Sequence, residues 1–276
     1  MMEPGRLRPE ELREVMDWAE REGWNPGLDD ASAFYQSDPE GFFAARIDGN
    51  LVAAISVVNH SDQFAFLGLY ICRPAYRGQG IGFALWQYAM QHAGPRTLGL
   101  DGVSDQQDNY CRSGFVHAGA TLRFEGRIPG AAHPDLRRVA PGDIPELTRL
   151  EAAANGYSKA RFLAEWLCDT ATRKTLVLVS AGKCAGFATV RECQNGFKVG
   201  PLVAGSLTDA KVLLRGAAEF AGAGPVVLDV PADMTQLTGC CREFGMTVSF
   251  QTVRMYKGQP PAPGSQIRSV ATLELG

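Results

Sequence analysis

The sequence predicts an α/β protein of the three-layer α+β type that carries one fold twice, each time as a mixed, mostly antiparallel sheet with helices on both faces. Two phrases, FFAARIDGNLVAAISVV and TLVLVSAGKCAGFATV, each read as a strand, a tight turn around Gly49 or Gly182, and a second strand. An apolar strand and a helix follow each phrase, and each half closes with a strand ending in glycine, LRFEG or VRMYKG. A long repeat of this kind indicates two copies of one architecture.

Both halves also begin alike, with a short strand and a helix that has acidic residues in its first turn, in LRPEELREVMDWAEREGW and LRRVAPGDIPELTRLEAAANG. The expected order in each half is strand, two helices, three strands, helix, strand, helix, strand. We therefore expect domains at 1–128 and 135–258, joined by the Pro- and Gly-containing linker RIPGAAHPDL. The tail, 259–276, opens with a flexible stretch. Its last run, 268–275, alternates enough to form a strand at a sheet edge, and a frayed end is the alternative.

Composition limits the class of protein. The chain has 276 residues, 45% hydrophobic and 21% charged, with a net charge of −3, which is typical of a globular protein with a real core. Lys and Arg are scattered, so neither nucleic acid nor a membrane is expected as a partner, and no apolar window is long enough for a membrane span. Seven cysteines without a CxxC motif indicate reduced thiols in a cytoplasmic protein. The four histidines are well separated, so we expect no metal site.

The phrase YRGQGIGFALWQYAM places three glycines, Gly78, Gly80 and Gly82, between an apolar strand and a helix. Its spacing fits neither the dinucleotide pattern GxGxxG nor the nucleotide pattern GxxxxGK[ST]. Glycines let the backbone approach an anion closely, and the unpaired amides of a helix start attract negative charge. Arg77 can add a charge-assisted bond to a phosphate. A glycine-rich turn without a ligand is the alternative interpretation.

This Arg-x-x-Gly-x-Gly phrase resembles the pyrophosphate loop of the GNAT superfamily of acyl-CoA-dependent N-acetyltransferases, whose pattern is [QR]-x-x-G-x-[GA]. The resemblance implies acetyl-CoA as the acyl donor. Besides Arg77, the residues expected to hold its pyrophosphate are Gly78, Gln79, Gly80, Ile81 and Gly82. In that family the strand before the loop splays and its backbone pairs with the pantetheine, and the matching residues here are Leu69, Tyr70, Ile71 and Cys72.

A second phrase, YCRSGF, matches the family pattern Y-x-x-x-G-F at Tyr110, Gly114 and Phe115. The resemblance implies that Tyr110 is the general acid that protonates the leaving thiolate. A phenol suits that task because its unperturbed pKa, about 10, is comparable with that of a thiol. The alternative is a tyrosine that only packs its helix on the sheet.

The amine must also lose a proton, and the candidate acceptors are Glu22, Asp101 or a water chain to either. Cys72 and Cys111 lie close to the inferred site in the sequence, but no histidine lies near enough to activate either thiol. We therefore expect direct transfer without a covalent enzyme intermediate.

The segment between the first two helices shapes the acceptor site in the family. Here its candidate substrate residues are Glu22, Trp24, Asn25, Phe34 and Tyr35, although the aromatic residues can equally be core. The second half lacks the glycine loop, and it has Cys241-x-x-x-Gly245-Met246 where the first half has the tyrosine phrase. We therefore expect a degenerate GNAT-like domain that binds no coenzyme A and supplies a wall of the acceptor pocket or a packing partner.

Together these features predict an N-acetyltransferase in which an amine attacks the thioester of acetyl-CoA through a tetrahedral intermediate. A small-molecule amine is the expected acceptor. A non-catalytic acyl-CoA-binding sensor and a protein acetyltransferase are the alternatives. The acceptor's identity, the acyl-chain preference and the oligomeric state stay open at this point.

Overall fold

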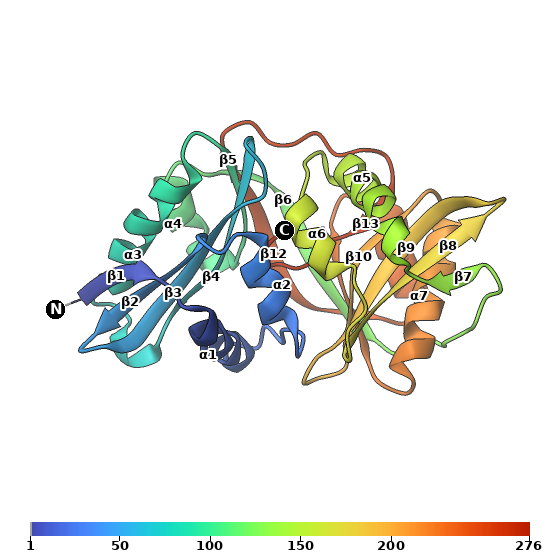
Figure 1. The fold of residues 1–276 in the computed structure, drawn as a ribbon, viewed down its shortest axis with the longest axis horizontal. Coiled ribbons are helices and arrows are strands. Elements are labelled where there is room, and N and C mark those ends of the chain that lie inside the picture. The colour runs from blue at the N-terminus through green and yellow to red at the C-terminus, as the bar shows by residue number, and fades with distance from the viewer. Residues whose placement is uncertain (1) are drawn as a thin grey trace.

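A sheet of thirteen strands runs through the molecule in the computed structural model, which describes residues 2–276 (Figure 1). Its order is β1-β2-β3-β4-β5-β12-β6-β11-β10-β9-β8-β7, with β13 paired to β10 beside this path. Only β4–β5 and β10–β11 pair in parallel among the described strands. The mixed, mostly antiparallel sheet predicted from the sequence is confirmed.

The element order predicted for each half is also confirmed. The first half contains β1 (Met2–Arg6), α1 (Pro9–Arg21), α2 (Asp30–Ser37), β2 (Phe42–Ile47), β3 (Asn50–Asn59), β4 (Phe64–Cys72), α3 (Ile81–Ala89), β5 (Thr97–Gly102), α4 (Gln107–Arg112) and β6 (Val116–Gly126). The second contains β7 (Leu136–Arg138), α5 (Ile144–Asn155), α6 (Ala160–Trp166), β8 (Arg173–Ser180), β9 (Lys183–Glu192), β10 (Phe197–Ala204), α7 (Leu207–Ala221), β11 (Val226–Pro231), α8 (Thr235–Glu243) and β12 (Thr247–Lys257).

The two hairpins that revealed the repeat have the geometry that their turn residues require. Asp48 and Gly49 have φ values of 50° and 76°, and Ala181 and Gly182 have 49° and 74°. Two successive positive φ angles are the mark of a type I′ turn, whose twist matches that of the flanking strands. These two turns set the register of the first hairpin, β2–β3, and of its counterpart, β8–β9.

The halves exchange their last strands. β12 from the second half pairs with β5, and β6 from the first half pairs with β11. Two buried ion pairs hold the exchange: Arg254 of β12 binds Asp101 of β5, and Arg123 of β6 binds Asp229 of β11. The ranges 1–128 and 135–258 remain our proposal for the two domains. Neither range is complete by itself, because each half of the sheet includes a strand from the other range.

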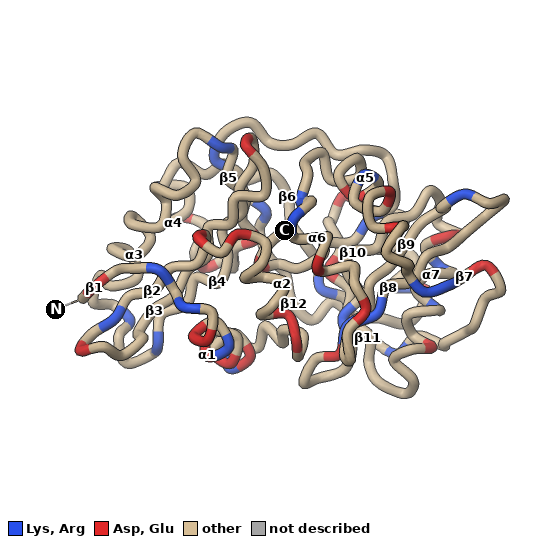
Figure 2. Tube along the Cα trace, in the orientation of Figure 1, with Lys and Arg blue, Asp and Glu red and all other residues tan. Residues whose placement is uncertain are grey.

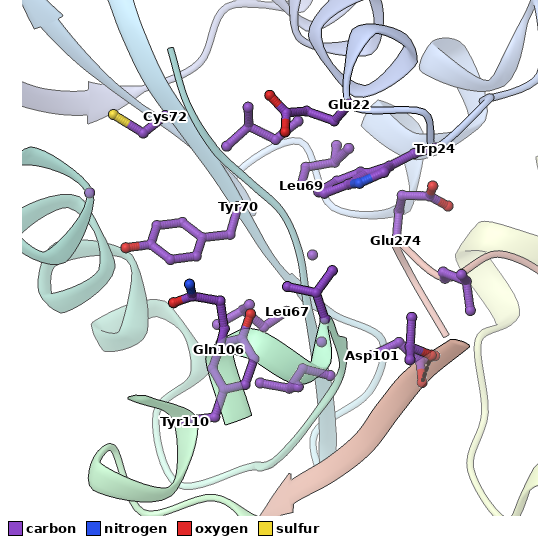
Figure 3. A pocket seen from close by; sticks show the side chains of 18 of the residues that line it. Glu22, Trp24, Leu67, Leu69, Tyr70, Cys72, Asp101, Gln106, Tyr110 and Glu274 are labelled. Carbon is purple, nitrogen blue, oxygen red and sulfur yellow. Dashed lines mark hydrogen bonds between the residues drawn. The ribbon is translucent and has the colours of Figure 1, made fainter. Parts of the chain in front are cut away.

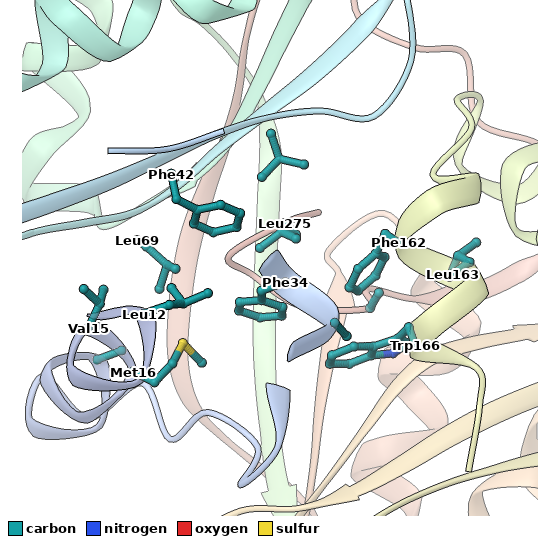
Figure 4. Packing of buried hydrophobic residues seen from close by; sticks show 14 of the residues in the cluster. Leu12, Val15, Met16, Phe34, Phe42, Leu69, Phe162, Leu163, Trp166 and Leu275 are labelled. Atoms are coloured by element: carbon teal, nitrogen blue, oxygen red, sulfur yellow. The ribbon is translucent and has the colours of Figure 1, made fainter. Parts of the chain in front are cut away.

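Helices cover both faces of the sheet. On one face of the first half, α3 packs against β2, β3 and β4, whereas α1 lies against β4 on the other. α2 meets α6 of the second half, so one apolar core runs across the join between the halves (Figure 4). There, Phe34 of α2 stacks on Trp166 of α6 with ring centroids 6.0 Å apart. This core fixes the second half against α2 of the first.

The C-terminal tail does not lie at a sheet edge. Of its alternating run, only β13 (Ile267–Ser269) is a strand, and it pairs with β10 where β10 separates from β11. The chain then enters the core between the halves, where His60 Nε2 lies 2.7 Å from the carbonyl oxygen of Leu275. The edge-strand expectation for 268–275 is therefore corrected, because burial between the halves replaces the pairing of a longer strand.

The helix lengths and the distribution of charge bear on whether a membrane or a nucleic acid could be a partner. No helix within residues 2–276 is both long enough and apolar enough to cross a membrane. Basic and acidic residues are interspersed over both halves, as Figure 2 shows, in agreement with the scattered Lys and Arg of the sequence.

Candidate active site

The parallel strands β4 and β5 separate halfway along β4 and open the site. They pair from Phe64 with Thr97 to Leu67 with Leu100, and no pair follows among the described residues. Beyond that point Leu69 has a positive φ of 44°, and the register of β4 against β3 shifts, which is a β-bulge. The backbone from Leu69 to Cys72 therefore faces a gap, as expected for a strand that pairs with a pantetheine arm.

A cavity of about 570 Å³ lies between the separated strands (Figure 3). It is lined by β4, the glycine loop, β5, α4 and β12, together with the C-terminal tail. Most of the predicted cofactor residues line it: Leu69, Tyr70, Ile71, Cys72, Arg77, Gly78, Gly80, Ile81 and Gly82. Gln79 does not, because its side chain turns back and donates to the carbonyl oxygen of Ala75 at 3.0 Å. Only the backbone amide of Gln79 remains available to bind the pyrophosphate as predicted.

The glycine loop is shaped as an anion site. Gly78 and Gly80 have φ values of 74° and 77°, and a Cβ on either would meet nothing within 4 Å. Gly80 is the N-cap of α3 and has no side chain to satisfy the first amides of the helix. Arg77 joins the loop to the end of α1, because its Nε donates to the Cys72 carbonyl at 2.8 Å and its guanidinium binds Glu22. The open space and unpaired amides fit a pyrophosphate.

Tyr110 reaches the cavity from α4. Its ring stacks on Trp86 at 5.8 Å and lies so close to Gly102 that a Cβ there would overlap it. Its hydroxyl points into the cavity (Figure 3) and has no hydrogen-bond partner among residues 2–276. Burial raises the pKa of the Tyr110 phenol to about 12. The side chain is therefore a fixed, protonated donor beside the separated strands.

The predicted acceptor residues divide into two groups. Glu22 and Trp24 line the cavity, whereas Asn25, Phe34 and Tyr35 do not. The substrate role expected for these three is corrected, because each makes structural contacts instead. Asn25 joins the halves through two hydrogen bonds with the Asn195 backbone. Phe34 is fully buried in the core between the halves, and Tyr35 stacks on Phe42.

The cavity lining also contains residues that sequence reasoning missed. They come from β6, β12 and the C-terminal tail, and they are Arg123, Phe250, Thr252, Leu273 and Glu274. The only sequence signal for them was the missing cofactor loop of the second half, which suggested that this half supplies a pocket wall. Nothing in the local sequence marks these individual positions.

The two carboxylates considered as proton acceptors are both bound to arginine. The Asp101 side chain is buried, and it accepts from Arg254 Nε at 2.9 Å and from the hydroxyls of Thr121 and Thr252. Glu22 binds Arg77 at the loop. Because of these contacts, Asp101 is positioned to hold the exchanged strand rather than to accept a proton.

No group of three or more His, Cys, Asp or Glu side chains within residues 2–276 is placed to hold a metal ion.

We expect Asp101→Asn to lower the free energy of unfolding by about 3–5 kcal/mol, because it leaves the Arg254 charge buried without its partner. At this chain length the melting temperature should fall by on the order of 10 °C. Asp62→Asn is the control, since Asp62 is 99% exposed in its ion pair with Arg96. Loss of turnover at an unchanged melting temperature would instead make Asp101 the base.

Comparison with known proteins places this geometry in a family. A family model described as "Acetyltransferase (GNAT) family" matches residues 10–109, and a second model, described as "Acetyltransferase (GNAT) domain", matches residues 147–268. The holothin acyltransferase of Pseudoalteromonas sp. (strain SANK 73390) is 32% identical over 272 residues, covering 97% of this chain and 92% of that protein.

Two solved structures show the same fold. A proposed acetyltransferase from Pyrococcus horikoshii has a TM-score of 0.84 at 19% identity and covers 100% of this chain and 96% of its own. A tandem GNAT protein from the clavulanic acid biosynthesis pathway has a TM-score of 0.63 at 15% identity, with coverages of 96% and 100%. The chain belongs to the GNAT acetyltransferase family, as an acyl-CoA-dependent N-acyltransferase with two GNAT domains in tandem.

Proposed function

We propose that this N-acyltransferase transfers an acetyl group from acetyl-CoA to a small-molecule amine by direct attack of the amine on the thioester. One observation supports this most strongly: the free backbone of β4, the glycine loop and the Tyr110 hydroxyl all open onto one cavity. A group bound along β4 with its diphosphate at the loop would thus bring its far end beside Tyr110. The relative that acylates holothin, by its name, supports a small acceptor.

The site residues suit each part of this reaction. Backbone amides at the bulge around Leu69 can stabilise the oxyanion that forms at the thioester carbonyl. As the amine nitrogen bonds to the carbonyl carbon and the C–S bond breaks, Tyr110 gives its proton to the sulfur. The amine gives up its N–H proton to solvent, and the tyrosine regains a proton from solvent, so that the products are the amide and the free thiol. No covalent bond to the enzyme forms, so neither Cys72 nor Cys111 needs activation.

The acceptor side is enclosed by both halves, which favours a small amine over a protein substrate. Trp24 comes from the first half, whereas Phe250 and Leu273 come from β12 and the tail. Concave sites lined by apolar groups with a few polar atoms are typical of small-molecule recognition. The apolar walls further favour an amine with an aromatic or aliphatic body.

Release of free coenzyme A tests this function. The purified protein is given acetyl-CoA with a panel of small primary amines, with a lysine-containing peptide, or with no acceptor. We expect release that depends on small amines. Tight acetyl-CoA binding without turnover of any amine would favour the sensor, and turnover of the peptide alone would favour a protein acetyltransferase. Longer acyl-CoA donors, tested with the best amine, decide whether acetyl is preferred.

We further propose that each chain has one acyl-CoA site. In the second half, β13 pairs with Leu202–Ala204 of β10, the segment that corresponds to the free backbone of β4. The N-cap of α7 is Ser206, whose side chain accepts from the Asp209 amide, whereas the N-cap of α3 is a glycine. The chain's own groups thus occupy the backbone and helix start that the first half leaves open.

Calorimetric titration with a non-reactive acyl-CoA analogue should therefore give one site per chain. Gly80→Ala should weaken that single binding event, because it alters the loop of the first half. A second site of similar affinity, unaffected by Gly80→Ala, would contradict the proposal and would place cofactor in the second half.

A further inference from the structure

The cavity contains one acidic side chain that the structure leaves without a partner. Glu22, Asp101 and Glu274 are the carboxylates that line it. Glu22 binds Arg77 and Asp101 binds Arg254. Within residues 2–276, no hydrogen bond or ion pair reaches the Glu274 carboxylate, although the residue as a whole is only 4% exposed. Glu274 is therefore a buried carboxylate without a partner among these residues, in the lining of the cavity.

Glu274 lies next to the point where β4 and β5 separate. A Cβ on Gly68 would overlap the carbonyl oxygen of Glu274, so the tail passes directly over the residue that precedes the bulge at Leu69. In Figure 3 the Glu274 side chain extends beside Trp24, and Tyr110 lies on the other side of Leu67. A reacting carbonyl held at the bulge would thus have the acid on one side and this carboxylate on the other.

The tail segment that carries Glu274 is held firmly. The Thr272 hydroxyl accepts hydrogen bonds from the amides of Glu274 at 3.1 Å and Leu275 at 3.0 Å. His60 binds the Leu275 carbonyl, and the buried Lys159 donates to the carbonyl oxygen of Gly276. A functional side chain needs this kind of rigid support to keep its geometry.

The charged groups around Glu274 already have other partners. Arg123 of β6 forms two hydrogen bonds with Asp229 of β11, and Arg191 of β9 binds Asp30. Lys198 of β10 donates to the Trp24 carbonyl at 2.7 Å. Within residues 2–276, none of these three cations forms a hydrogen bond or ion pair with the Glu274 carboxylate. A purely structural counterion would be expected to touch at least one of them.

We propose that Glu274 binds the acceptor amine and takes its proton, an inference that rests on the proposed function. The carboxylate accepts a hydrogen bond from the amine N–H. As the N–C bond forms and the C–S bond breaks, the amine proton moves to Glu274 and the Tyr110 proton moves to the sulfur. Glu274 then releases its proton to water. The second half thus supplies, through its tail, the acceptor-side group of the first half's site.

The test compares Glu274→Gln and Glu274→Asp with wild type, using the best amine of the panel, and takes Glu14→Gln on the exposed face of α1 as the control. Glutamine keeps the size of the side chain but removes its basicity. We expect about a 100-fold loss of kcat/KM for the amine in Glu274→Gln, partial recovery in Glu274→Asp, and an unchanged dissociation constant for acetyl-CoA.

The outcomes separate the two proposals. Turnover in Glu274→Gln within twofold of wild type would overturn the role of Glu274 and leave the proposed function intact. Equal losses in the Gln and Asp variants, accompanied by a lower melting temperature, would also overturn it and would indicate a structural carboxylate. Absence of turnover in wild type with every amine would overturn both.

Discussion

Replacing Tyr110 by phenylalanine should lower kcat by about 100-fold, the lower range of what a positioned general acid contributes. The hydroxyl is the only group lost, so the ring should keep its stacking on Trp86 and its contact with Gly102. Acyl-CoA binding and the melting temperature should therefore stay close to wild type. Steady-state kinetics with the best amine, together with titration of acetyl-CoA, measure both effects.

The pH dependence of the wild-type enzyme follows from the same side chain. Burial raises the pKa of Tyr110 to about 12, so the phenol stays protonated at lower pH and can act as an acid. A raised pKa means that this role is lost only as the pH rises through that value. We therefore expect no loss of kcat from Tyr110 between pH 7 and about pH 10, where a phenol at its usual pKa would be about half ionised.

Two other tyrosines serve as comparisons. Tyr88→Phe removes a hydroxyl from an exposed position on α3 that does not line the cavity, and it should leave kcat unchanged. Tyr70 lines the cavity, and burial also raises its pKa to about 12, but its hydroxyl points toward α3 near Gly82 (Figure 3). If Tyr70→Phe rather than Tyr110→Phe abolished turnover, the acid would be Tyr70.

Local patterns in the sequence were enough to predict the element order. The turns at Asp48–Gly49 and Ala181–Gly182 each contain a glycine, which adopts positive φ without strain, and period and turn chemistry locate the strands on either side. The strand exchange has no such signal. β6 and β12 are equally long strands at the ends of the two repeats, and Asp101 and Arg254 lie far apart in the sequence. Their pairing depends on tertiary contacts alone.

The site divides in the same way. The predicted cofactor loop is one continuous phrase, so Gly78 and Gly80 could be assigned to it from the sequence. The acceptor side is assembled from distant segments, and Glu274 reaches it from a tail that the pattern assigned to a sheet edge. Phe34 was expected to contact substrate, but it lies in the core between the halves. The sequence alone does not distinguish an aromatic residue that lines a pocket from one that fills a core.

Replacing Gly80 by alanine should raise KM for acyl-CoA by about 10- to 100-fold with a smaller change in kcat. Left-handed backbone costs a residue with a Cβ about 1–2 kcal/mol, so the loop will tend to leave the φ of 77° that aims its amides outward. The Cβ of the alanine would also project into the open space where a pyrophosphate would lie. The loss should appear in the dissociation constant of acetyl-CoA as well.

Gly49→Ala provides the matched control, because Gly49 has a φ of 76° and a Cβ there also meets nothing within 4 Å. Both variants should lose a similar, small amount of stability, since the backbone cost is the same. Only Gly80→Ala should weaken acyl-CoA binding, because only its amides lie at the start of α3. Equal KM values in the two variants would mean that the loop is merely a tight turn, so the difference between them isolates what the loop contributes to holding the phosphates.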